Sequence, residues 1–346
     1  MLNLTGLLKI SSLLLIFNSS VSAQENRYVR KNKSARKIQY TKHLCYSRSI
    51  LVKDSMVYTA NSNGALYATN LKTEKSTNLL KNRKFEEMRD LEFSGKDILG
   101  MQSGTYGLIA KTDTENFIEY ITPTSSMWIG TFLDGMDILK NTGFIMGDPK
   151  KGFFSLYYSE NAGLEWKECD GKVAAMDGEA GFAASGTNVQ VINDSTFVFV
   201  SGGSKSRFFK TTNKGKTWKI TSLPYMTSES SGAFSIYMFS EQIGVIVGGD
   251  YKNPDLSLNI SFFTDDGGEF WINSETQPRG YRSCVIEEKG VFYACGTNGL
   301  DYSQDFGNTW KPFANGNFYA LFSYEEKLYA TTDNGSFKIF DLVNLY

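Results

Sequence analysis

This chain has a single histidine and almost no net charge, and each of these two features excludes a class of site. His43 is the only histidine among the 346 residues, so a metal centre of several histidines is excluded and a Ser-His-Asp triad would have to use His43. The 36 lysines and arginines are balanced by 37 aspartates and glutamates. This balance argues against a nucleic-acid partner.

Proline is also rare, with six residues against 25 phenylalanines, 19 tyrosines and 32 glycines. A chain rich in aromatic residues and glycine but poor in proline is typical of many short strands joined by tight turns. No stretch has a helical pattern, and no GxGxxG motif lies between a strand and a helix, so no dinucleotide-binding fold is predicted. We therefore expect an all-β protein with no cofactor and no metal ion.

Long apolar runs are missing except for one short run near the N-terminus. Lys9 precedes the apolar residues 10–17, and Val21-Ser22-Ala23 has the small residues of a signal-peptidase site. We interpret residues 1–23 as a Sec signal peptide cleaved after Ala23, because the apolar run is too short to span a bilayer. The mature protein is then expected to be secreted or periplasmic, with no transmembrane segment.

A basic stretch follows the predicted cleavage site. Residues 27–42 hold seven basic residues and no acidic one. The stretch could touch an anionic surface, or it is a solvated arm, which we expect for residues 24–36. Residues 37–346 are then predicted to form a single domain.

Four cysteines occur, at Cys45, Cys169, Cys284 and Cys295, and none has the spacing of a metal site. Cys284 and Cys295 flank a predicted hairpin whose turn lies near Lys289-Gly290, which places them opposite each other on adjacent strands. Two interpretations remain open for this pair, a cross-strand disulfide and two buried thiols.

The pattern Ser/Thr-x-Asp/Asn-x-Gly-x-x-Trp occurs four times, and we call it the repeat motif. Its copies contain Asn161, Gly163 and Trp166; Asn213, Gly215 and Trp218; Asp266, Gly268 and Trp271; and Asp305, Gly307 and Trp310. The Asp or Asn side chain can accept backbone N–H bonds across a tight turn, and the glycine can adopt a positive φ. The tryptophan is expected to bury its ring between neighbouring sheets. The motif is therefore predicted to be structural rather than catalytic.

The spacing of the four tryptophans suits β-propeller blades of roughly 40–50 residues with four strands each. Pairs of strand-like segments predict seven blades in all. These pairs are 56–60 with 65–69, 98–102 with 106–111, 143–146 with 153–158, 197–200 with 207–210, 244–247 with 258–263, 291–295 with 300–302, and 327–331 with 336–340. The last blade runs out of chain after its third strand, so residues 37–41 are predicted to supply its outer strand and close the ring.

Propeller topology predicts which residues share a face. The repeat motifs fall on turns between third and fourth strands, so all four lie on one face. The candidate ligand-binding residues on the opposite face are Asp134, Asp137, Asp148, Glu179, Ser185, Arg207, Asp250, Tyr251, Arg282 and Asn298. Carboxylates and two arginines converging at the channel mouth would form a polar pocket, and the alternative is that these residues are solvated loop tips.

The repeat motif resembles the Asp box, or BNR repeat, of sialidases and related propellers. Segments such as Gly147-Asp148-Pro149, Gly248-Gly249-Asp250-Tyr251 and Gly280-Tyr281-Arg282-Ser283 make roughly residues 40–346 similar to the photosystem II stability/assembly factor family. The resemblance implies a secreted bacterial seven-bladed propeller with four-stranded antiparallel blades. Members of that family are often labelled oxidoreductase or glycosyl hydrolase, so the resemblance implies no single chemistry.

These features lead to one functional expectation and one alternative. We expect a monomeric, non-enzymatic binding or assembly module of the cell envelope, whose partner, an envelope protein or a glycan, binds the Arg/Asp-rich face. The alternative is a carbohydrate-active hydrolase or lyase that uses the same pocket. Arg207 and Arg282 could serve a sialidase-like clamp, but the early Arg-Ile-Pro motif of sialidases is absent. For a general glycosidase, no spacing selects one pair of carboxylates over the others.

Overall fold

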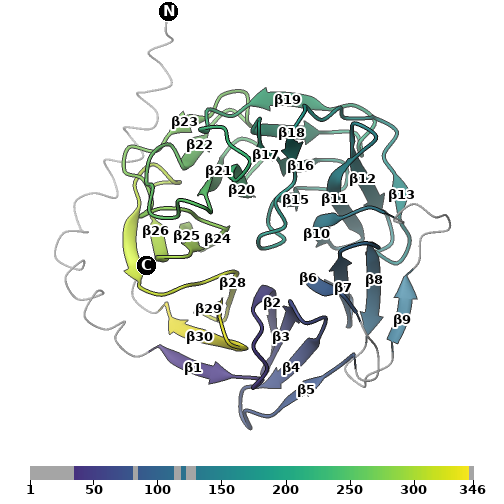
Figure 1. Ribbon diagram of the computed structural model, residues 1–346, viewed down its shortest axis with the longest axis vertical. Coiled ribbons are helices and arrows are strands. Elements are labelled where there is room, and N and C mark those ends of the chain that lie inside the picture. Colours follow the sequence, from purple (N-terminus) through teal and green to yellow (C-terminus); the bar gives the residue numbers. More distant parts are fainter. Residues whose placement is uncertain (1–34, 81–84, 113–117, 122–129, 343–346) are drawn as a thin grey trace, which may run out of the picture.

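The computed structural model describes residues 35–80, 85–112, 118–121 and 130–342. These residues form seven antiparallel sheets, or blades, arranged as a ring around a central channel (Figure 1). The predicted all-β, seven-bladed propeller is confirmed. No helix occurs among the described residues, so this part of the chain contains no helix that could cross a membrane.

Each blade runs from an inner strand at the channel to an outer strand at the rim. Blade 1 contains β2 (Ser47–Lys53), β3 (Met56–Asn61), β4 (Leu66–Asn70) and β5 (Ser76–Asn78); blade 2 contains β6 (Glu87–Ser94), β7 (Asp97–Ser103), β8 (Leu108–Thr112) and β9 (Ile118–Ile121). Blade 3 contains β10 (Leu133–Leu139), β11 (Thr142–Lys150), β12 (Phe153–Ser159) and β13 (Lys167–Glu168); blade 4 contains β15 (Val189–Val191), β16 (Phe197–Val200), β18 (Arg207–Thr211) and β19 (Lys219–Ser222).

The remaining blades follow the same plan. Blade 5 contains β20 (Ser231–Met238), β21 (Gly244–Asp250), β22 (Ser261–Thr264) and β23 (Ile272–Asn273), extended inward by β17 (Gly202–Gly203) and β14 (Glu179–Ala180). Blade 6 contains β24 (Cys284–Glu288), β25 (Val291–Gly296), β26 (Gly299–Ser303) and β27 (Lys311–Ala314). Blade 7 contains β28 (Leu321–Tyr324), β29 (Lys327–Thr332), β30 (Ser336–Asp341) and β1 (Arg36–Gln39).

Blade 5 differs from the prediction in two ways. Its sheet has six strands rather than four, because Gly202 pairs with Gly232 of β20. A Cβ at Gly232 would lie 2.5 Å from the Cα of Gly202, so this close pairing needs glycine. The third strand begins at Ser261 instead of residue 258, where the Ser261 N–H donates to the side-chain oxygen of Gln277 at 2.9 Å.

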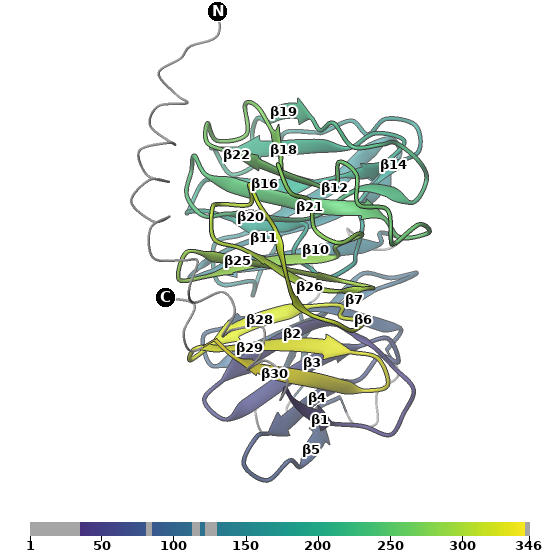
Figure 2. The same cartoon turned by 90° about the vertical axis from the view of Figure 1, so that its left-hand side faces the viewer.

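The ring is closed by the N-terminal strand β1, which pairs with β30 of the last blade (Figures 1 and 2). Arg36 lies opposite Ile339, and Gln39 lies opposite Ser336. The sequence placed this strand at residues 37–41, and the structure shifts it slightly toward the N-terminus. The closure leaves the sheet of blade 7 with the same four strands as its neighbours.

In every copy of the repeat motif, the same hydrogen bonds close the turn before the outer strand. The Ser or Thr hydroxyl accepts the N–H of the motif glycine at 2.9, 3.0, 3.0 and 2.9 Å in the four copies. The Asp or Asn oxygen accepts an N–H four residues later, at 2.9, 2.9, 3.1 and 2.8 Å. Trp166, Trp271 and Trp310 are buried, and Trp218 is half-buried. The motif thus closes its turn with the bonds that its residue types predict.

Polar side chains also connect the inner strands of neighbouring blades. These bonds run from the Leu91 N–H to Ser49 Oγ, from Met136 N–H to Asp90 Oδ2, from Val191 N–H to Asp137 Oδ2, and from Val285 N–H to Ser235 Oγ. A further bond, from Thr331 Oγ1 to the Ser47 carbonyl at 2.8 Å, joins blade 7 to blade 1. Each bond satisfies a buried polar group that would otherwise be costly.

Candidate binding face and central channel

One end of the central channel is closed by residues 181–187, which we call the plug. The plug lies between β14 and β15, near the centre of the ring in Figure 1, where it is drawn in teal. Most of its residues are small and buried, and Phe182 is its one large side chain. We call the end of the propeller that carries it the plug face, and the end that carries the repeat motifs the motif face.

Four inner strands carry a β-bulge at the level of the plug. The pairing register shifts between Ser47 and Ser49, Met88 and Asp90, Leu133 and Gly135, and Ala233 and Ser235. The residues left out of register are Arg48, Arg89, Asp134 and Phe234. A bulge re-aims a side chain, and all four of these side chains are directed at the plug.

Two of the bulged residues are arginines that hold the plug backbone. Arg48 Nη1 donates to the Ala184 carbonyl at 3.1 Å, and Arg89 Nη1 donates to the Ala183 carbonyl at 2.7 Å. Both guanidinium groups also face one carboxylate, that of Glu87, at 3.6 and 2.6 Å. The two arginines therefore share the Glu87 carboxylate, and Arg89 also interacts with the carboxyl groups of Asp134 and Asp148. The side chains of Arg48, Arg89 and Glu87 remain about one-fifth exposed.

The bulged Phe234 holds the plug through its ring. Phe234 stacks on Phe182, with ring centroids 4.2 Å apart and an interplanar angle of 5°. Tyr251 meets both rings edge-on at 6.3 Å, and Tyr281 meets Phe234 edge-on at 4.8 Å. Tyr251 is 47% exposed, so the aromatic cluster reaches the surface of the plug face.

The bulged Asp134 lies beneath the plug beside a second carboxyl group. Burial, followed by the charge of Asp148, raises the pKa of Asp134 well above its ordinary range. Burial also raises the pKa of Asp148, whose Oδ1 accepts the Gly181 N–H at 3.1 Å. The two predicted residues are thus brought together as a pair that can share one proton.

The predicted site residue Arg207 is not available to a ligand. Its guanidinium forms a buried ion pair with Glu179, another predicted residue, through Nε to Oε1 at 2.7 Å and Nη2 to Oε2 at 2.5 Å. Nη2 also donates to the Ala174 carbonyl at 2.7 Å. Removing one partner of such a pair costs about 3–5 kcal/mol, so the structure assigns both residues to the stability of the fold.

Arg282, at the start of blade 6, is likewise not available to a ligand. It is 0% exposed and donates to Asp301, which also receives Arg279 Nε at 2.7 Å. The predicted Asn298 accepts from Arg282 Nη1 at 2.8 Å through its side-chain oxygen. The partner Asp301 was missed, because nothing in the local sequence shows which arginine it meets.

The other predicted residues are dispersed around the plug face. Asp250 accepts from the Lys252 N–H of its own turn at 2.9 Å and from Ser230 Oγ, just before β20, at 2.6 Å. Ser185 belongs to the plug and donates to the Ser283 carbonyl at 2.7 Å. Asp137 faces the interior of the channel rather than this surface. The single pocket that was predicted is therefore replaced by a plugged face and a separate cavity.

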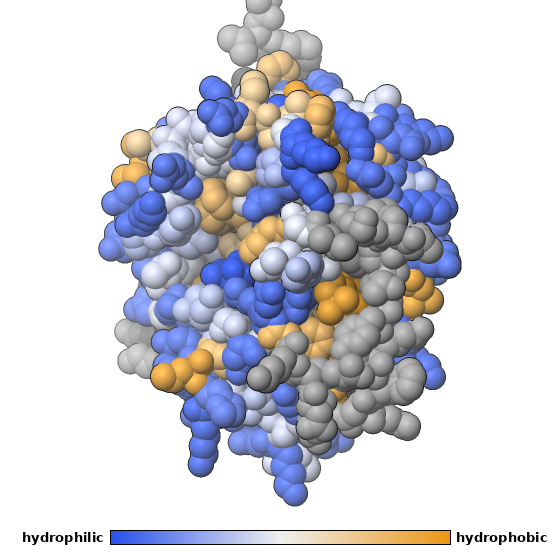
Figure 3. Space-filling model, turned by 45° about the vertical axis from the view of Figure 1, so that its right-hand side comes forward, coloured by the Kyte–Doolittle hydropathy of each residue, from blue (hydrophilic) through white to orange (hydrophobic). Residues whose placement is uncertain are grey.

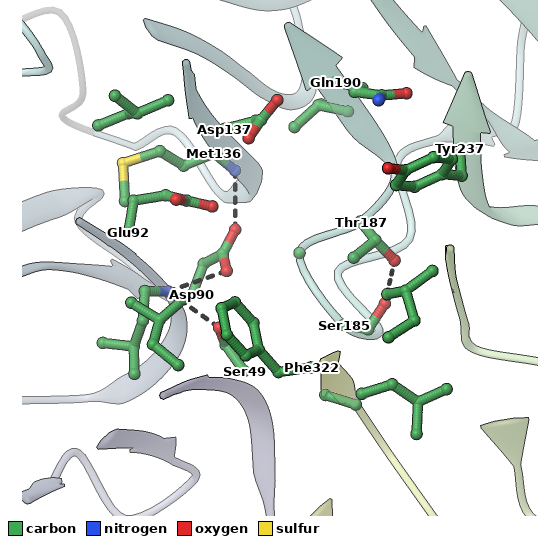
Figure 4. Close-up of a pocket in the computed structure, with 18 of the residues that line it drawn as sticks. Ser49, Asp90, Glu92, Met136, Asp137, Ser185, Thr187, Gln190, Tyr237 and Phe322 are labelled. Carbon is green, nitrogen blue, oxygen red and sulfur yellow. Dashed lines mark hydrogen bonds between the residues drawn. The ribbon is translucent and has the colours of Figure 1, made fainter. Parts of the chain in front are cut away.

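The cavity lies in the channel and has a volume of about 320 Å³ (Figure 4). Its wall is largely apolar, and the inner strands of all seven blades contribute to it. The polar lining residues labelled in Figure 4 are Ser49, Asp90, Glu92, Asp137, Ser185, Thr187, Gln190 and Tyr237. Among its described lining residues none is a lysine or arginine, so three carboxyl groups share the cavity without a cation.

Burial keeps these carboxyl groups partly protonated near neutral pH. Burial raises the pKa of Asp90 to about 7 and that of Asp137 to about 6, although both accept backbone N–H bonds that lower it. Burial and the nearby charges of Asp137 and Asp90 raise the pKa of Glu92 well above its ordinary range. Of these carboxyl groups the sequence predicted only Asp137. The alternation Asp90-Leu91-Glu92-Phe93 places two carboxylates on one face of a strand, and it is the signal that could have found them.

No group of three or more His, Cys, Asp or Glu side chains within the described ranges is arranged to hold a metal ion. Cys284 and Cys295 are free, buried thiols at paired positions of β24 and β25. Figure 3 shows polar residues over most of the visible surface, with apolar residues in separate patches between them. The predicted signal peptide and basic arm lie mostly outside the described residues.

Known proteins resemble this chain in fold only. No protein-family model matches it, and no curated protein does. The solved structure of the WD40 β-propeller domain of Doa1 has a TM-score of 0.63 at 10% identity, covering 90% of this chain and 98% of that one. YCF48 bound to a D1 peptide has a TM-score of 0.62 at 13% identity, covering 90% and 96%. The computationally designed protein Ika8 has a TM-score of 0.55 at 10% identity, covering 88% and 98%.

Proposed function

We propose that this protein is a non-enzymatic binding or assembly module that holds a protein partner on its plug face. The observation that carries the proposal is the pair of bulged arginines, Arg48 and Arg89, which stay about one-fifth exposed beside the plug, together with the exposed ring of Tyr251. Arginine and aromatic side chains are the residue types enriched at binding hot spots. A propeller of the same fold, YCF48, is bound to a D1 peptide in its solved structure, which supports a peptide segment as the ligand class.

The chemistry of the plug face suits a polypeptide partner. Arg48 and Arg89 retain partial exposure beside Glu87, so a partner carboxylate could accept hydrogen bonds from their guanidinium groups. Tyr251 provides an exposed ring on a cluster whose other rings are fixed by stacking. Rigid aromatic rings give contact area with little loss of side-chain entropy.

We further propose that the protein acts in the cell envelope as a monomer after export. Support comes from the apolar residues 10–17 and the small residues before Gln24. Intact-mass analysis of protein recovered from the native host should give a chain that begins at Gln24. Recovery from the cytoplasm with residues 1–23 attached would contradict export.

Binding is tested with two exposed aromatic residues on opposite faces. Tyr251 is 47% exposed on the plug face, and Phe270, in a repeat motif, is 75% exposed. Mature protein is immobilised, proteins retained from envelope extract are identified, and the retained protein is purified for calorimetry. Tyr251→Ala should weaken the affinity about tenfold, whereas Phe270→Ala should change it less than about twofold.

The same experiment can reject the proposal. Equal binding by wild type and Tyr251→Ala, together with loss in Phe270→Ala, would move the interface to the motif face. Binding of a glycan on a glycan array, with no protein retained, would show that the partner is a glycan and not a protein.

A carbohydrate-active hydrolase is the second candidate, and the cavity carboxyls favour it. Many glycosidases pair a protonated carboxyl that donates a proton with an ionised one. The raised pKa of Glu92 and the pKa of about 6 of Asp137 would supply both forms at neutral pH. Turnover of aryl glycosides by wild type but not by Glu92→Gln would establish this activity, and no turnover across a glycoside panel would exclude it.

A further inference from the structure

Cys284 and Cys295 lie at directly paired positions of the inner two strands of blade 6. Both residues are 0% exposed, and both thiols are free. The Cα atoms of paired residues in antiparallel strands are about 4.5–5.5 Å apart, which falls within the range of a disulfide. A bond between these two cysteines would therefore need side-chain rotation rather than backbone movement.

The other two cysteines do not share this arrangement. Cys45 precedes β2 in blade 1, where its thiol donates to Asn61 Oδ1 at 3.6 Å, and Cys169 follows β13 in blade 3. Each is buried on its own in a different blade. They are matched internal controls, because they have the same burial but no thiol opposite them.

The two paired thiols differ in acidity. Burial raises the pKa of Cys295 well above its ordinary range, and its hydrogen bond with Cys284 adds to this shift. Burial alone would raise the pKa of Cys284, but the neighbouring Cys295 thiol, the Leu321 backbone and the nearby Thr187 and Ser185 hydroxyls lower it. Cys284 is thus the member of the pair more easily converted to a thiolate.

The residues on either side of Cys284 hold the C-terminal half of the plug. The Ser283 carbonyl accepts from Ser185 Oγ at 2.7 Å. The Val285 N–H donates to Ser235 Oγ at 2.8 Å, and Ser235 Oγ lies 2.5 Å from Thr187 Oγ1. The plug is therefore attached to both chain neighbours of Cys284, and its Ser185 and Thr187 hydroxyls lie close to the Cys284 thiol.

We propose that Cys284 and Cys295 form a reversible dithiol–disulfide pair whose oxidation loosens the C-terminal half of the plug. Oxidation removes the S–H of Cys284, the only hydrogen-bond donor of that side chain, beside the Ser185 and Thr187 hydroxyls, and leaves a disulfide sulfur that can only accept weakly. The inference does not depend on the identity of a partner, because the plug itself is the readout.

The reaction balances with a disulfide oxidant such as oxidised glutathione. The Cys284 thiolate attacks one sulfur of the oxidant, a mixed disulfide forms, and one glutathione thiolate leaves. The Cys295 thiol then loses its proton and attacks the Cys284 sulfur, releasing the second glutathione. The two cysteines lose two electrons and two protons, and the oxidant becomes two molecules of glutathione. Because both thiols are buried, the reaction needs opening of blade 6 or occurs before the blade has folded.

The test compares oxidised and reduced forms of the same full mature chain. Protein refolded with oxidised glutathione should alkylate at two cysteines after denaturation, and reduced protein should alkylate at all four. Peptide mapping should link Cys284 to Cys295. Amide hydrogen exchange in residues 181–187 should then be about threefold to tenfold faster in the oxidised form, the effect of losing one hydrogen bond.

Two controls make the result decisive. The Cys45→Ala/Cys169→Ala variant should keep both the linkage and the change in exchange, and exchange in the repeat motif at residues 211–218 should not change. Absence of a link between Cys284 and Cys295 after refolding with oxidant would overturn the proposal. A link with unchanged exchange in the plug would overturn the coupling to the channel.

Discussion

Each end of this propeller repeats its own backbone feature four times, and the two ends differ in how alike the side chains of the four copies are. On the motif face, the four turns are closed by the same hydrogen bonds between the same types of side chain. On the plug face, the four bulges have the same backbone position but carry two arginines, an aspartate and a phenylalanine. We infer that the repeat with uniform side chains stabilises the fold, whereas the repeat with varied side chains builds one particular site.

The largest expected effect comes from exchanging side chains between two bulges. Phe234→Arg gives this bulge the residue type of the Arg48 bulge, but it removes the stack on Phe182 and buries a positive charge. The free energy of unfolding in urea should fall by about 4 kcal/mol or more. The conservative control, Phe234→Tyr, should cost less than half as much. If the exchange costs no more than the control, the bulges are interchangeable and the contrast between the faces fails.

The free energy of unfolding should depend on pH through Asp137, which lines the channel cavity. Its raised pKa is about 6 against an ordinary value of 3.8. Between those values the folded state holds a proton that the unfolded state has released, so this group's contribution to stability is lost as pH rises. Asp137→Asn removes that loss. The variant should therefore gain stability relative to wild type between pH 4 and 7, by on the order of 2 kcal/mol. A difference that stays constant over this range would show that Asp137 does not titrate in the fold.

A single repeat motif should give a smaller effect. Asp266→Ala removes the acceptor for the Phe270 N–H at 3.1 Å and for the Thr264 hydroxyl at 2.8 Å. The unfolding free energy should fall by about 1 kcal/mol. The neighbouring exposed Asp265→Ala is the matched control and should change it by less than about 0.5 kcal/mol. Equal losses in the two variants would mean that the motif side chain does not hold the turn.

The smallest effect is expected from an exchange within the motif face. Asn161→Asp gives the first copy the residue type that the third and fourth copies have at Asp266 and Asp305. The same oxygen can accept the Glu165 N–H, so thermal and urea unfolding should change by less than about 0.5 kcal/mol. A loss of 2 kcal/mol would show that these turns are as individual as the bulges.

The fold was predictable because its signals are local. The repeat motif places its hydroxyl, its carboxyl or amide, and its glycine within five residues, so their hydrogen bonds can be inferred from spacing. The strand pairs follow from alternation and from the turns between them. The outer strand β1 was inferred from a missing strand in the last blade, and only its exact limits differ.

The site was predicted only in part, because its contacts join distant residues. Arg207 meets Glu179, and Arg282 meets Asp301, and no local pattern shows that these arginines are neutralised. A bulge adds one residue to a strand without a distinct sequence pattern, so nothing in the sequence indicated a role for Arg48 and Arg89. Of the plug residues, the sequence indicated only Ser185 as a candidate, because the position of the plug inside the channel depends on contacts with other blades.

The pairing of β1 with β30 also sets the order in which the molecule can mature. β1 is the first described strand to be synthesised, and its partner lies at the far end of the described chain. Such non-local pairing slows folding, since a very long loop must close before the contact forms. β1 must therefore remain unpaired until β30 has been synthesised, and its free edge can pair with other chains throughout that interval.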